Sequence, residues 1–204
     1  MTLDHIDNLS LSQEQIDRHT NELNSLRYLG AGLRSLAQTV AGIEAEVLSR
    51  LPSDRMYMSY GNDPELAWVP NDLLCCMFHW YSVSVHNYVQ LVAWLSGKRD
   101  KDITGYIEAV IPEVRTFRNK IAAHFAKCDP WRDDTPASLE ASTIYPICWR
   151  DDAFWANLFG MRLTQDSKSS SSGEHIKPWS LTKVHSTLVQ RYWPDDGPRQ
   201  SGDC

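Results

Sequence analysis

The stretch LLCCMFHWYSVSVHNYVQLVAWLSG, residues 73–97, contains no aspartate, glutamate, lysine or arginine. A helix can begin near Pro70 or Asn71 and end at Gly97. Its length would allow a membrane span, but polar side chains crowd its middle and are costly at the centre of a bilayer. These side chains are His79, Ser82, Ser84, His86, Asn87 and Gln90. The stretch therefore predicts a helix buried in a soluble bundle, with a face that can also lie at a subunit interface.

A long helical pattern precedes this stretch. Ser10 or Ser12 can open it with a capping box, and apolar residues then recur at helical spacing up to Pro52. The apolar positions are Ile16, Leu23, Leu26, Leu29, Leu33, Leu36, Val40, Ile43 and Val47. Glycines weaken the middle of the pattern, at Gly30, Gly32 and Gly42. The pattern allows two helices with a bend or one long bent helix, and we favour the single helix.

Two more helices and a short hairpin complete the predicted fold. A third helix runs from about Asp102 to Lys127 with a kink or restart at Pro112, and a last helix follows Ser180. Between them, near residues 142–164, two aromatic and β-branched runs flank RDDA and predict a β-hairpin. The predicted fold class is mainly α, an up-and-down helical bundle with a small β-hairpin insertion.

Length and composition favour one domain. The 204 residues, 42% of them hydrophobic, can fill one substantial core. We expect a single helical domain over residues 1–193, in which the insertion at 129–177 carries the hairpin and a Ser-rich loop. Residues 194–204 are expected to form a disordered tail.

Charge and cysteine usage limit the function classes. The formal net charge of −6 argues against a general electrostatic coat for nucleic acid, so contact with nucleic acid would need a local cluster of Arg and Lys. Five cysteines are an odd number and form no C-x-x-C pair, which suggests reduced thiols. The N-terminal residues lack the pattern of a secretory signal. A cytoplasmic location is expected.

The residues that suggest chemistry lie late in the third predicted helix, in TFRNKIAAHF, residues 116–125. Apolar residues form one arc of this helix: Val114, Phe117, Ile121 and Phe125. With Val114 set at zero, Arg118 falls inside the arc at about +40° and His124 at its edge near −80°. The two side chains are thus about 120° apart around the axis and roughly 9 Å apart along it.

An arginine cannot be neutralised to avoid the cost of burial, so an inward Arg118 needs an anion or water. One explanation is a structural ion pair with an acid on the first helix, such as Glu44 or Glu46. In a second, the arc faces a symmetry-related subunit and Arg118 hydrogen-bonds across that interface. In a third, the anion is a substrate phosphate, and His124 transfers a proton near neutral pH. The residues alone leave these alternatives open.

The remaining histidines suggest a metal site less strongly. His79 and His86 are one heptad apart on one helix face, and with His124 they could form a three-histidine site. No E-x-x-H sequence accompanies them on a paired helix, so histidines in the core or at an interface are the favoured interpretation. We predict neither a metal nor a cofactor.

The segment RNKIAAH, residues 118–124, resembles the R-x(4–6)-H motif of the HEPN domain family, with a polar residue, Asn119, directly after the arginine. The longer FRNKIAAHF is similar to prokaryotic members connected with toxin–antitoxin and abortive-infection systems. The resemblance covers roughly residues 10–127 and 178–193. It implies an up-and-down helical bundle that dimerises so that two motifs meet in one cleft. In active members it implies a metal-independent endoribonuclease.

The resemblance also implies a role for each residue of the motif. Arg118 would bind and stabilise the scissile phosphate, and His124 would be the general acid or base in attack by the ribose 2′-OH. Asn119 would orient these two side chains or contact the ligand. Lys120 is a candidate for contact with the RNA backbone, and a solvated helix position is the favoured interpretation for it. The implied partners are a second copy of the chain, an RNA substrate and a nucleotidyltransferase-like antitoxin, with no membrane. The alternative is a non-catalytic HEPN-like bundle that binds a nucleotide or a protein partner.

Overall fold

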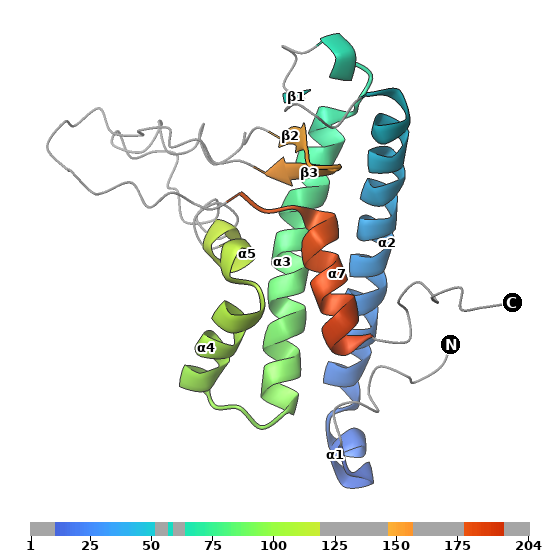
Figure 1. Cartoon of the computed structure of the whole chain (residues 1–204). Coiled ribbons are helices and arrows are strands. Elements are labelled where there is room, and N and C mark those ends of the chain that lie inside the picture. The colour runs from blue at the N-terminus through green and yellow to red at the C-terminus, as the bar shows by residue number, and fades with distance from the viewer. Residues whose placement is uncertain (1–10, 52–56, 59–63, 119–146, 157–177, 194–204) are drawn as a thin grey trace, which may run out of the picture.

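The computed structural model describes residues 11–51, 57–58, 64–118, 147–156 and 178–193. These residues form a helical bundle with a small antiparallel sheet at one end (Figure 1), so the predicted fold class is confirmed. The elements are α1 (Gln13–Arg18), α2 (Thr20–Arg50), β1 (Tyr57–Met58), the 3₁₀ turn η2 (Pro64–Leu66), α3 (Asn71–Leu95), α4 (Asp100–Val110), α5 (Pro112–Phe117), β2 (Ile147–Arg150), β3 (Ala153–Ala156) and α7 (Leu181–Tyr192).

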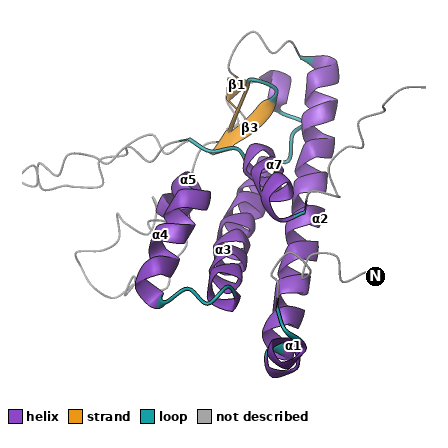
Figure 2. Cartoon of the chain, turned by 60° about the horizontal axis from the view of Figure 1, so that its bottom comes forward, coloured by secondary structure: helices purple, strands orange, loops and turns teal. Residues whose placement is uncertain are grey.

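Helix α3 is the centre of the bundle. It packs between α2 on one side and α4 and α5 on the other, and α7 lies against α2 (Figures 1 and 2). Its inward face is apolar and fully buried, and includes Leu74, Phe78, Tyr81, Val85 and Val89. Within the described ranges, every helix is too short or too polar to span a lipid bilayer.

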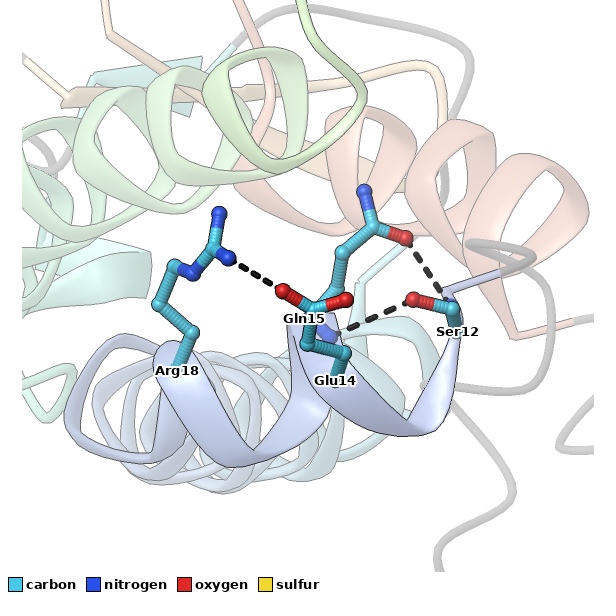
Figure 3. Close-up of polar contacts among 4 residues, drawn as sticks. All are labelled: Ser12, Glu14, Gln15 and Arg18. Carbon is cyan, nitrogen blue, oxygen red and sulfur yellow. Dashed lines mark hydrogen bonds and ion pairs between the residues drawn. The ribbon is translucent and has the colours of Figure 1, made fainter.

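Ser12, one of the two predicted capping residues, is the N-cap of α1. The backbone N–H of Gln15 donates to Ser12 Oγ at 3.3 Å, and the N–H of Ser12 donates to Gln15 Oε1 at 2.9 Å (Figure 3). These two bonds form a capping box. The helix breaks at His19, where φ is −112° and ψ is 28°. The expected single bent helix is therefore two helices, and the break is not at the glycines.

Helix α2 passes through all three glycines without interruption. At Gly30 a Cβ atom would lie 3.5 Å from the rings of Tyr88 and Trp193, so the glycine lies where α3 and the end of α7 approach α2 closely. At Gly32 and Gly42 a Cβ atom would meet nothing within 4 Å. The glycines thus weaken the helix without ending it, because packing against α3 and α7 stabilises it.

The predicted restart at Pro112 is confirmed. Ile111 leaves the helical conformation with φ −139° and ψ 57°, and Pro112 is the first residue of α5. Proline suits this position because the first helical N–H has no partner within the helix. The predicted continuation of the helix to Lys127 lies outside the described residues.

The predicted hairpin is formed by β2 and β3. Their antiparallel register pairs Ile147 with Ala156 and Arg150 with Ala153. Asp151 and Asp152 connect them with φ values of 50° and 59°, the positive angles that a two-residue hairpin turn requires. Strand β1 extends the sheet on the other edge of β2. The Ser-rich loop, the rest of the expected insertion and the expected tail lie outside the described residues.

Candidate functional site

Arg118 directly follows α5 and is the one predicted site residue in the described part of the chain. Its side chain is half-buried, and its backbone keeps the helical conformation. The preceding Phe117 is fully buried and packs edge-on against Trp179, with 5.3 Å between the ring centroids. The inward orientation of this helix face follows from the apolar arc that begins at Val114, which is also fully buried.

The other predicted site residues, Asn119, Lys120 and His124, lie outside the described residues. Their position relative to Arg118 therefore stays a prediction.

His86 on α3 is an electrostatic neighbour of Arg118. Its side chain is only 8% exposed, and its Nδ1 atom has no hydrogen-bond partner among the described residues. Burial lowers the pKa of His86, and the positive charges of Arg118 and Arg115 lower it further. At neutral pH the imidazole is therefore neutral, and it can accept or donate one hydrogen bond without adding charge beside the arginines.

Arg115 and Arg118 differ in their surroundings. Arg115 forms an ion pair with Glu108 of α4, across the break at Ile111. This pair offsets part of the positive charge that faces His86 and fixes the direction of α5 relative to α4. Arg118 comes one helical turn later, at the end of α5.

The two acids that could have paired with Arg118 are engaged elsewhere. Glu44 is buried, and its Oε1 accepts hydrogen bonds from the N–H of Phe154 at 2.8 Å and from the hydroxyl of Thr182 at 3.1 Å. Glu46 forms an ion pair with Arg50 one turn further along α2. The structural explanation of Arg118 in terms of these two carboxylates is therefore not supported.

Histidines do not gather into a metal site in the part of the chain that the structure describes. No group of three or more His, Cys, Asp or Glu side chains there is arranged to hold an ion. His79 and His86 are both on α3, and burial lowers the pKa of each. The third histidine of the considered site, His124, lies outside the described residues.

The outer face of α3 carries an uncharged stripe, which we call the α3 stripe. It comprises Leu73, Cys76, Met77, Trp80, Val83, Ser84, Asn87, Leu91 and Trp94. Trp80 is 65% exposed and Leu73 is 48% exposed, so large apolar side chains face outward over the length of the helix. From Leu73 to Trp94 the stripe is about 32 Å long at 1.5 Å per residue. Asn87 of the stripe directly follows His86, so the surroundings of Arg118 border it.

Sequence reasoning found Arg118 from the helical period but did not connect it with His86. The two residues are on different helices, and only the packing of α5 on α3 brings them together. The one available signal was a histidine within an uncharged helix. The chain matches no family model, and no curated protein or solved structure matches it.

Proposed function

We propose that this chain is a HEPN-like, metal-independent endoribonuclease of toxin–antitoxin or phage-defence type that acts as a homodimer in the cytoplasm. The observation that carries the proposal is Arg118. It is a half-buried arginine directly after α5, and its positive charge acts on the buried imidazole of His86.

Arg118 suits a phosphate for two reasons. A guanidinium presents paired N–H donors that match two phosphate oxygens, and it stays charged when partly buried. The half-buried position at the end of α5 reduces competition from water, which strengthens the interaction with an anion. Charge that builds on the phosphate oxygens during cleavage would be stabilised there.

The chemistry needs a proton acceptor and a proton donor as well. The ribose 2′-OH attacks the adjacent phosphorus, the 2′ proton leaves to a base, and the departing 5′ oxygen takes a proton from an acid. His124 is proposed to carry out one of these transfers, because imidazole exchanges protons near neutral pH. Asn119 would orient Arg118 and His124, and Lys120 would contact the RNA backbone. The products are a 2′,3′-cyclic phosphate and a 5′-hydroxyl.

The α3 stripe supports the proposed dimer. In a two-fold symmetric contact the same surface is used by both copies, so a charge near the symmetry axis would meet its own copy. The α3 stripe has no charged residue over its whole length, and it exposes Trp80, an aromatic residue of the type enriched at interfaces. Because the surroundings of Arg118 border this stripe, pairing of two copies would bring two motifs toward each other.

The direct test is cleavage of single-stranded RNA by the purified protein in EDTA. We expect cleavage without added metal, 2′,3′-cyclic phosphate ends and no cleavage of DNA, which lacks the 2′-OH. The variant His124→Ala should be slower by about 10²- to 10⁴-fold, the usual contribution of general acid–base catalysis. A requirement for metal, or equal inactivity of wild type and variant against total cellular RNA, would leave the non-catalytic binding module as the function.

The proposed antitoxin needs a separate experiment. Co-expression with a small nucleotidyltransferase encoded next to this chain should relieve growth inhibition by the wild type. Growth inhibition that persists unchanged in the co-expressing cells would exclude that protein as the antitoxin.

A further inference from the structure

A groove of about 220 Å³ lies beside the helix that leads to Arg118. Its walls come from the α4–α5 junction, from β3 and from the start of α7, and the residues that matter here are Glu113, Trp155, Trp179 and Lys183. All four are in the described part of the chain. The groove is smaller than the roughly 300–1,000 Å³ of pockets that enclose a drug-sized ligand, so it suits a single flat ring.

The walls of the groove are fixed to one another. Ala156 of β3 and Trp179 exchange two backbone hydrogen bonds, of 3.0 and 3.3 Å, which hold the sheet against the start of α7. The Trp179 ring in turn packs on Phe117, the residue directly before Arg118. The groove and Arg118 are therefore connected through two buried rings and keep a fixed relation to each other.

Positive charge and an aromatic ring meet at the edge of the groove. The indole N–H of Trp155 donates to the carbonyl of Arg150 at 3.0 Å, which fixes the orientation of the ring. The Arg150 guanidinium lies 4.7 Å and the Lys183 ammonium 4.9 Å from the centre of this ring. Arg150 also lies beside Asp151, with 3.9 Å between Nε and Oδ2, so Lys183 supplies most of the uncompensated positive charge. A local cluster of this kind is what a chain of net charge −6 needs to contact a nucleic acid.

A hydrogen-bonding group also lines the groove. The Glu113 carboxylate is an acceptor. A nucleobase that carries an amino group on its edge can donate to it.

We infer that this groove is a subsite for one nucleotide of single-stranded RNA, with its phosphate at Lys183 and Arg150 and its base against Trp155. The inference rests on the proposed function and adds a second place at which the substrate is held. Only a base that is not paired in a duplex can enter a groove of this size. Binding there would fix the register of the strand relative to Arg118.

The test measures binding of a short single-stranded RNA in which every 2′-OH is methylated, because such a strand cannot be cleaved by 2′-OH attack. Fluorescence anisotropy with wild type, Lys183→Ala and Trp155→Ala gives the affinities. Trp155→Ala should weaken binding by about 5- to 150-fold, the range for loss of one base–aromatic stack. Lys183→Ala should reduce the slope of log affinity against log salt by about 0.7, the value for one phosphate contact on a single strand.

The exposed lysine Lys101 on α4 provides the matched control, because it is outside the groove. Lys101→Ala should bind the RNA as the wild type does. If Lys183→Ala and Trp155→Ala bind like Lys101→Ala while the wild type cleaves unmodified RNA, the subsite is refuted and the proposed function stands. If the groove variants lose binding but the wild type never cleaves RNA, the subsite stands and the nuclease is refuted. If the wild type does not bind the methylated RNA, the subsite is refuted.

Discussion

Glu44 is a buried residue that ties the sheet to two helices of the bundle. From α2, its Oε1 accepts hydrogen bonds from the backbone of β3 and from the hydroxyl of Thr182 on α7. Burial raises the pKa of this carboxyl to about 7, against the lowering effects of these bonds and of Lys183. The folded protein thus holds a proton on Glu44 more tightly than the unfolded chain does.

This difference predicts a pH-dependent stability. The ordinary pKa of this carboxyl is 4.5, and below that pH the stabilisation from the protonated carboxyl is fully present. It is lost as the pH rises through the raised pKa of about 7. The free energy of unfolding contributed by Glu44 should fall by up to about 3 kcal/mol over this window. The free energy of unfolding, measured by urea denaturation at pH 5 and pH 8, should change less with pH in Glu44→Gln than in the wild type. Glu46→Gln, which changes an exposed acid, is the control and should keep the wild-type dependence.

The variant Arg118→Ala tests whether Arg118 binds the substrate or stabilises the fold. In the proposed role the Arg118 charge acts on a phosphate of the substrate, so we expect the melting temperature to change little while RNA cleavage is lost. Arg118→Lys should recover only part of the activity, since an ammonium cannot form the paired bonds of a guanidinium. A destabilisation of a few kcal/mol in Arg118→Ala, measured by urea denaturation, would instead indicate a structural ion pair.

At the scale of elements, local signals predicted what local forces determine. The capping box at Ser12, the restart at Pro112 and the cap at Ser180 each depend on residues within a few positions, and each is present in the structure. The break at His19 carries no comparable signal, because histidine is an ordinary helix residue. Strand β1 was not predicted, since two residues form a strand only by pairing with β2, far along the chain.

In the candidate site, too, features set by nearby residues were predicted and features set by distant segments were not. The helical period predicted that Arg118 faces inward, because that depends only on the spacing of apolar residues in one helix. The proximity of His86 and the engagement of Glu44 by β3 and α7 depend on packing between distant segments. Such contacts cannot be derived from the residue pattern of one element.

The glycines of α2 lead to a prediction for that helix. Gly32 and Gly42 are exposed, and a Cβ atom at either position would meet nothing within 4 Å. Alanine there should stabilise the helix by about 0.5–1 kcal/mol per site, because glycine loses more backbone entropy on folding. Chemical denaturation of Gly32→Ala and Gly42→Ala measures this gain. Gly97→Ala should have the opposite effect, since Gly97 has a φ of +78° that alanine adopts only with strain.

For the whole molecule, the α3 stripe is the exposed surface that we propose a second copy of the chain covers. Three hydrogen-bonded pairs tie the inner bundle together: Tyr81 with His185, Tyr88 with Trp193, and Tyr106 with Tyr192. These contacts belong to the faces of α3 and α4 that meet α7. Trp94 of the α3 stripe packs edge-on against His19 of the N-terminal segment, with 4.9 Å between the ring centroids, while Trp80 and Leu73 are exposed. A second copy of the chain is the occupant that the stripe's lack of charge favours.

The variant Trp80→Arg tests this dimer. Trp80 is the most exposed large apolar residue of the α3 stripe, and in a two-fold contact the substitution adds a positive charge from each copy to an apolar interface. The wild type should be a dimer at micromolar concentration by light scattering, and Trp80→Arg should be a monomer with an unchanged melting temperature and much reduced RNA cleavage. Tyr28→Arg is the matched control, because Tyr28 is an aromatic residue of α2 that is 81% exposed and outside the stripe. A Trp80→Arg variant that remains dimeric would show that the α3 stripe is not the interface, and a monomeric wild type would remove the composite site altogether.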